Sequence, residues 1–141
     1  MRTLDAFLNR VPMYRLTLYY LACIWFAAIA CGALGWVPYS PAVIVLSGVF
    51  LLAACNLANE AFAWAFSVPT NHESASITAL ILTLIMPPAL SVPSLAALAA
   101  AGFIAMASKY CIAFRHTHLF NPAAFAAVVM GIAFGESASC G

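Results

Sequence analysis

The sequence predicts an all-α, polytopic membrane protein with about five transmembrane segments, two of them short or broken. Of its 141 residues, 66% are hydrophobic and only 6% are charged. A soluble domain of this size cannot hide so much apolar surface, because its surface needs polar cover. Prolines and polar caps divide the chain into apolar runs. Two of these runs are shorter than the ~20 residues that a helical crossing needs.

The composition excludes several classes of function. The net charge is +1 with five Lys and Arg residues, too few for a phosphate-backbone footprint, so we expect no nucleic-acid partner. The five cysteines form no C-x-x-C pair, and no metal site is expected. Cys23 and Cys31 are eight residues apart and fit either a ligand pair or small packing residues. We find no nucleophile–base pair or glycine-rich phosphate loop, so no catalytic residue is proposed.

We expect a single membrane domain over residues 1–141. Residues 1–13 form an interfacial amphipathic segment, in which Leu4, Phe7 and Leu8 share one face and Pro12 ends the helix. Residues 14–135 form the transmembrane bundle, and residues 136–141 form a polar tail. The chain stops where another helix would begin, which indicates a fragment or one member of an assembly.

Three segments are long enough to cross a bilayer as helices, over residues 14–37, 41–66 and 93–114. Aromatic residues stand near both ends of the first, as in interfacial belts. Ser40 and Pro41 supply an N-cap and a first-turn proline for the second. The third is rich in alanine, with Gly102, and such small residues let helices approach closely in lipid.

The segment after Pro69 is predicted to be a broken crossing. Thr70 and Glu73 have the capping-box spacing, so a helix should begin near Asn71 and continue until Pro87-Pro88. About 13 helical residues rise only ~20 Å. Extended backbone after the prolines would complete the crossing, and it is tolerated at membrane depth only where protein or a wet cavity covers it. This segment should therefore lie inside the bundle.

A second short helix is predicted from Asn121 as N-cap, through Pro122, to about Phe134. With five crossings, the arginines before the first span and the pair Lys109 and Arg115 lie on one side of the membrane. The positive-inside rule makes this side the cytoplasm. The C-terminus then lies outside.

The second long span carries a candidate ion pathway. Asn56, Asn59 and Glu60 are spaced i, i+3 and i+4, so they fall on one face of the helix. Ionisable residues in membrane helices are costly and point to function. Glu60 stands close to the cytoplasmic end, however, so snorkelling or an interhelical hydrogen bond explains it equally well as an ion or proton site.

Two helix starts are candidate ligand sites, because a helix N-terminus offers free N–H groups and a positive dipole end to oxygen atoms. At the first, Ser76 and Thr78 follow closely on the cap. The alternative there is a cap with interhelical hydrogen bonds and no ligand. At the second, cationic side chains precede Asn121 and form a plausible anion cradle, although ordinary positive-inside topology also accounts for Lys109 and Arg115. The candidate residues are Asn71, Glu73, Ser74, Ser76, Thr78, Lys109, Arg115, His118 and Asn121.

These two motifs resemble the NqrB/RnfD family, the membrane subunits of the sodium-pumping NADH:quinone reductase and of the Rnf ferredoxin:NAD oxidoreductase complex. Residues 71–88 (NHESASITALILTLIMPP) resemble its polar cap, short leucine-rich helix and Pro-Pro element. Residues 109–125 (KYCIAFRHTHLFNPAAF) resemble its Lys and Phe-Asn-Pro-Ala element. The resemblance spans about residues 40–135. The N-terminal segment is also similar to single-repeat versions that precede a flavin-binding reductase domain.

The resemblance implies broken helices, bound riboflavin or FMN, and electron transfer coupled to ion movement in the bacterial inner membrane. By position, the flavin environment is Asn71, Glu73, Ser74, Ser76 and Thr78 with Lys109, His118 and Asn121. The family's covalent flavin-attachment run is absent, so non-covalent flavin is expected. Family members contain two such repeats and this chain contains one, which implies that it works in a homo- or hetero-oligomer. Membrane lipid is the other expected partner.

We therefore expect a non-autonomous membrane subunit of a flavin-dependent oxidoreductase, working with a cytoplasmic flavin/NAD(P) reductase domain or subunit. The alternative from a different class is a small-solute or ion transporter acting as a dimer, indicated by the broken helices and Glu60. A third reading is a structural partner that only docks a reductase.

Overall fold

The computed structural model describes residues 13–88, 90–113 and 122–138, and it confirms the all-α fold for them. Three of the described helices are long and apolar enough to cross a membrane, over Met13–Ala33, Pro41–Phe66 and Val92–Cys111. The other two contain shorter apolar stretches, His72–Ile85 and Pro122–Ala133. In chain order the helices are α2 (Met13–Ala33), α3 (Pro41–Phe66), α4 (His72–Ile85), α5 (Val92–Ala113) and α6 (Pro122–Ala138).

Two predicted boundaries need correction. The first span ends at Ala33 instead of residue 37, because Gly35 adopts a left-handed φ of 74° and turns the chain. The last helix has 17 residues and runs to Ala138, so the predicted polar tail begins inside α6. Residues 1–12 of the predicted interfacial segment and the site residues Arg115, His118 and Asn121 lie outside the described residues, and Met13 already belongs to α2.

The bounds of α3 agree with the prediction, and local chemistry explains both ends. The Ser40 hydroxyl accepts a hydrogen bond from the Val43 amide at 3.4 Å, and Pro41 opens the first turn. At the other end Ser67 takes a left-handed conformation with φ 52°, and its N–H donates to the carbonyl of Trp64. The helix therefore stops before the sequence reaches Pro69.

The predicted break after α4 is present. The helix has 14 residues and rises only ~21 Å, about two-thirds of the ~30 Å hydrocarbon core. Met86 is already extended (φ −81°, ψ 140°), and its N–H makes the last helical bond, to the Leu82 carbonyl. Pro87 and Pro88 have no N–H to offer the preceding carbonyls. The helix consequently ends within the apolar layer.

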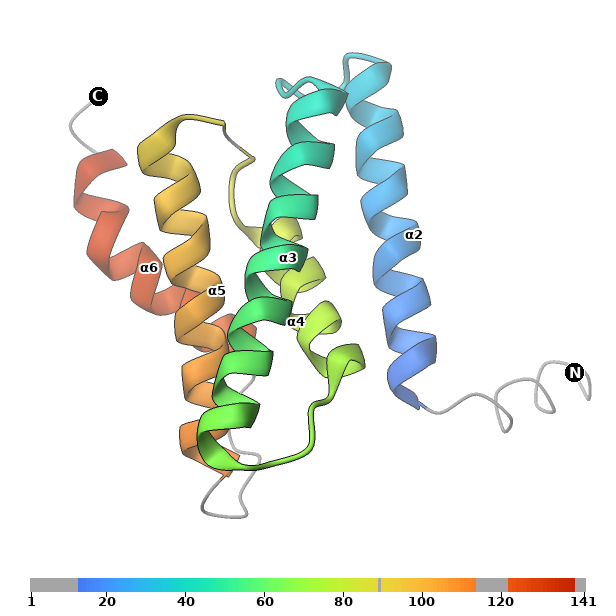
Figure 1. The fold of residues 1–141 in the computed structure, drawn as a ribbon. Helices are drawn as coiled ribbons and strands as arrows, with labels where there is room; N and C mark the ends of the chain where they lie inside the picture. The colour runs from blue at the N-terminus through green and yellow to red at the C-terminus, as the bar shows by residue number, and fades with distance from the viewer. Residues whose placement is uncertain (1–12, 89, 114–121, 139–141) are drawn as a thin grey trace, which may run out of the picture.

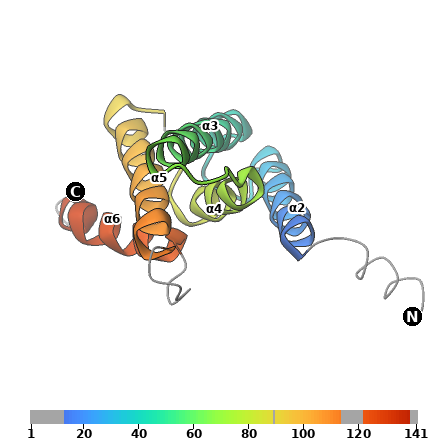
Figure 2. The same cartoon turned by 60° about the horizontal axis from the view of Figure 1, so that its bottom comes forward.

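The path of the chain makes α4 a broken crossing. In Figure 1, α4 starts at the end of the bundle where α3 finishes, and the chain reaches the opposite end before α5 begins. A re-entrant loop would return to the starting side. Figure 2 shows α4 beside α3, with α2 and α6 at opposite flanks. The helix contacts α2, α3, α5 and α6, so it is the interior element that the sequence predicts.

Small side chains build the main core, in which α3, α4, α5 and α6 all take part. A Cβ at Gly102 would stand 3.0 Å from the Cys55 sulfur, so α5 approaches α3 closely there. The buried members are Leu51, Cys55, Ala75, Ala79, Leu82, Leu98, Ala101, Ala105, Met106, Ala123, Ala126 and Met130.

A second, smaller cluster joins α2 to this core through Trp25, Ile44 and Leu80. The Trp25 indole lies directly over Gly48, where a Cβ would come within 2.4 Å of the ring. Most of the remaining surface of α2 is exposed, as expected for a helix that faces lipid on several sides.

Candidate functional site

The start of α4 is a capped and ion-paired helix end. Asn71 is the N-cap, and its side-chain oxygen accepts from the Ser74 amide at 3.1 Å. The predicted pairing of Thr70 with Glu73 is not used. Instead the Glu73 carboxylate receives a hydrogen bond of 2.7 Å from the Arg15 guanidinium of α2. A carboxylate therefore already occupies the first turn, where the helix dipole favours negative charge.

Three hydroxyl residues of this segment are buried or half-buried. Thr78 is buried, and its hydroxyl donates to the Ser74 carbonyl at 3.0 Å. Ser74 and Ser76 are half-buried, so both are only partly accessible to a bound molecule. The first two turns of α4 thus carry one buried and two half-buried hydroxyl groups.

A second polar cluster joins α3 and α5. Asn59 is fully buried, and its side-chain oxygen receives hydrogen bonds from the Lys109 ammonium at 3.3 Å and the Tyr110 hydroxyl at 3.0 Å. The Tyr110 hydroxyl also lies 3.2 Å from the Asn59 backbone carbonyl. These contacts link residues fifty positions apart in the sequence. We call Asn59, Lys109 and Tyr110 the α3–α5 cluster.

Aromatic rings fix the position of Tyr110. Its ring stacks on Phe62 at 5.7 Å and on Phe66 at 6.0 Å between centroids. Phe62 also contacts Phe103, at 5.0 Å. The Lys109 ammonium stands 5.6 Å from the Tyr110 ring centroid, within cation–π range. The cluster is therefore a rigid polar group set in an apolar surround.

The three candidate ion-pathway residues have different environments. Asn59 faces the bundle as described, whereas Glu60 is exposed on the outside of α3. Asn56 is half-buried, and its amide donates to the Leu52 carbonyl of its own helix at 2.8 Å. Among the described residues, no hydrogen bond or ion pair connects Glu60 with Asn59.

The start of α4 and the α3–α5 cluster are also separate in their bonding. In the described ranges, no hydrogen bond or ion pair joins the start of α4 to the α3–α5 cluster. The same ranges contain no group of three His, Cys, Asp or Glu residues suited to a metal ion. Arg15 and Tyr110 were not among the predicted site residues. Arg15 could have been found from the sequence, because it is a lone arginine in an apolar span.

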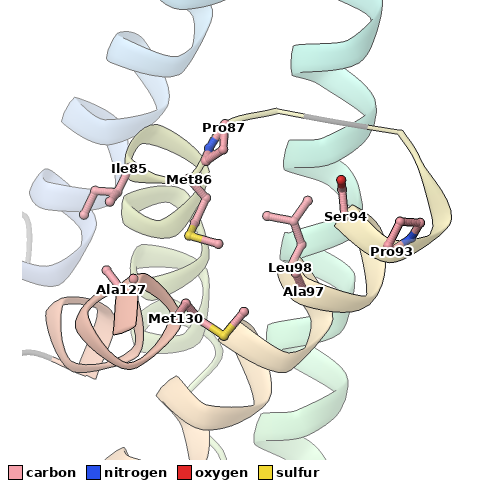
Figure 3. A pocket seen from close by; sticks show the side chains of 10 residues that line it. Ile85, Met86, Pro87, Pro93, Ser94, Ala97, Leu98, Ala127 and Met130 are labelled. Carbon is pink, nitrogen blue, oxygen red and sulfur yellow. The ribbon is translucent and has the colours of Figure 1, made fainter. Parts of the chain in front are cut away.

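A cavity of about 460 Å³ lies at the opposite end of α4 (Figure 3). The close-up shows Met86, directly after α4, and Met130 of α6 pointing toward Leu98 of α5. The cavity lies where α4 stops and the extended backbone begins. Pro87 predicts the end of α4 at this place, but the sequence does not predict the cavity itself. Its lining residues are Ile85, Met86, Pro87, Pro93, Ser94, Ala97, Leu98, Ala127, Met130 and Gly131.

Comparison with known proteins gives no assignment, since no family model, curated protein or solved structure matches the chain.

Proposed function

We propose that this chain is the membrane component of a flavin-dependent electron-transport oxidoreductase of the NqrB/RnfD type, in the bacterial inner membrane. It binds riboflavin or FMN non-covalently and works with a cytoplasmic flavin/NAD(P) reductase domain or subunit, in a homo- or hetero-oligomer. Coupling of electron transfer to ion movement is part of the proposal. The two motifs over residues 71–88 and 109–125 are its sequence basis.

The observation that supports this most is the interrupted helix α4 at the centre of the bundle. Interrupted membrane helices place their ends at binding sites for substrates and ions. The buried Thr78 and half-buried Ser76 lie on its first turns, within the proposed flavin environment. The sequence contains no nucleophile–base pair, so electron transfer needs a cofactor to carry the electrons, and the chain's own residues bind and orient that cofactor.

The direct test is whether the purified chain carries flavin. We expect protein expressed and purified in mild detergent with added riboflavin or FMN to be yellow, with the visible absorbance of bound flavin. NADH and a flavin reductase should bleach that absorbance. A colourless, folded protein after supplementation with both flavins would contradict the proposal.

A matched pair of variants tests the position of the flavin. Thr78→Val should reduce the flavin bound per protein, because it removes a hydroxyl from the proposed site. Thr83→Val is the control, since Thr83 lies on the same helix and makes the same kind of hydrogen bond, to the Ala79 carbonyl at 2.8 Å. Equal flavin loss in both variants would indicate a general effect on α4.

The second candidate is a solute or ion transporter acting as a dimer, and the cavity beside the broken end of α4 favours it. Flux into proteoliposomes without any reductant, abolished by Glu60→Gln, would support this function. Flux that requires a reduced electron donor would support the electron-transport proposal instead.

A further inference from the structure

The α3–α5 cluster contains hydrogen-bond donors that have no acceptor. The Asn59 side-chain nitrogen is buried and makes no hydrogen bond. An unpaired buried amide costs roughly 1–3 kcal/mol, so such groups are rare and need an explanation. The assignment of oxygen and nitrogen within this amide is fixed by Lys109, because an ammonium has only donors and must face the oxygen.

Lys109 also lacks a counter-charge. Among the described residues, the one ion pair is between Arg15 and Glu73, and no carboxylate lies within 4.0 Å of the Lys109 ammonium. Glu60 adjoins Asn59 in sequence but is exposed on another face of α3. The ammonium has three N–H groups and gives one to Asn59. A half-buried cation with donors to spare favours an anionic partner.

The start of α4 is less suited to an anion than this cluster. There the Asn71 cap accepts from the Ser74 amide, and the Glu73 carboxylate already places negative charge at the helix end. The α3–α5 cluster instead presents one positive charge and the unused N–H groups of Asn59. An oxygen acceptor would satisfy both at once.

We propose that Lys109 and Asn59 form a binding site for the oxygen atoms of a phosphate group. One oxygen pairs with the Lys109 ammonium, and another accepts from the Asn59 amide nitrogen. That nitrogen has no contact with solvent, so the Asn59 side chain has to shift to admit the oxygen. Lys109 stands in the last two turns of α5, which ends at Ala113. This is the depth at which lipid phosphates and phosphorylated ligands meet the protein.

The phosphate has two sources, a phosphorylated flavin and a phospholipid headgroup, which binding measurements distinguish. The full chain in neutral detergent is titrated with FMN, riboflavin, inorganic phosphate and a short-chain phosphatidylglycerol, followed by flavin fluorescence and thermal unfolding. FMN binding stronger than riboflavin binding, with competition by inorganic phosphate, assigns the site to the flavin phosphate. Stabilisation by phosphatidylglycerol with equal affinity for both flavins assigns it to lipid.

Two variants test the residues. Asn59→Asp replaces the amide by a carboxylate of the same shape, which removes the donor and gives Lys109 an internal counter-ion. Lys109→Gln removes the charge and keeps a donor for Asn59. Each should weaken binding of the phosphate-bearing probe on the order of tenfold or more, since charge-assisted hydrogen bonds are lost. Thr83→Val is the control and should leave binding unchanged, since Thr83 lies on α4 and its hydroxyl bonds to the Ala79 carbonyl of its own helix.

The outcomes separate this inference from the proposed function. Phosphatidylglycerol or phosphate binding that depends on Asn59, in a protein that takes up no flavin, supports the site and contradicts the flavin function. Flavin binding that is unaffected in folded Asn59→Asp and Lys109→Gln overturns the site and leaves the flavin function in place. A wild-type chain that responds to none of the phosphate-bearing probes also overturns it.

Discussion

At the scale of single residues, the fold depends on a few close approaches between helices. Gly48 lies under the Trp25 indole, and this contact holds α2 against α3. The Trp25 side-chain nitrogen is buried there without a hydrogen bond, so packing rather than polar pairing stabilises the contact. Such contacts tolerate no added volume.

Gly48→Ala is expected to destabilise the protein by about 1–3 kcal/mol, because the new methyl group overlaps the Trp25 ring and forces it aside. Thermal unfolding in detergent, followed by Trp fluorescence, measures the change. The control is Gly131→Ala, where a Cβ meets nothing within 4 Å. Unfolding temperatures that fall equally in both variants would contradict the role given to Trp25.

The α3–α5 cluster shows what the sequence predicts about single residues and what it does not. The sequence marks Asn59 and Lys109 as unusual, since polar residues in apolar spans are costly. It does not show that they meet, because that depends on how α3 and α5 cross. Tyr110 is an ordinary interfacial aromatic in the sequence, and only the packing of α5 against α3 gives its hydroxyl a partner.

At the scale of elements, local sequence signals such as caps and prolines predict the ends of the helices better than the lengths of the apolar runs do. Ser40, Pro41 and Pro69 bracket α3, and the prolines after α4 end it where predicted. The predicted end of α6 near Phe134 is wrong, because polar residues such as Glu136 and Ser137 end a helix only when they compete for its backbone bonds. The predicted end of a helix is therefore most accurate where a proline removes a backbone N–H donor.

The ion pair of Arg15 and Glu73 connects two elements, α2 and the start of α4. We expect Arg15→Glu and Glu73→Arg each to lower the unfolding temperature, and the double exchange to recover part of the loss. The recovery should shrink at high salt, because both side chains are partly exposed and screened. Single and double variants that unfold independently at every salt concentration would show that the pair does not couple the two helices.

At the scale of the whole molecule, the apolar surface of the helices shows that their solvent is lipid. Large apolar side chains stand exposed around the bundle, among them Trp36 at 77%, Trp64 at 86% and Ile132 at 75% of full exposure. Soluble monomers rarely expose large apolar patches, and three of the described helices are long and apolar enough to cross a membrane. Lipid contact satisfies these side chains, and the protein is accordingly a membrane protein.

The path of the chain predicts the sidedness of its connections. An epitope inserted after Trp36, between α2 and α3, should be reached by protease from outside the cell, in spheroplasts. One inserted after Val68, between α3 and α4, should be cut only in inverted vesicles, because the positive-inside rule predicts that the end of the bundle with Lys109 faces the cytoplasm. Cleavage of both sites from the same side would contradict the topology.

The shortness of α4 has a consequence for biogenesis. A stretch of 14 residues ending in two prolines is a weak signal for independent insertion into the bilayer. Its buried face is complementary to α3 and α5, which flank it in the sequence. We therefore expect α4 to enter the membrane late, in the company of its neighbours, so that ribosome-bound chains truncated before α5 leave it on the cytoplasmic surface.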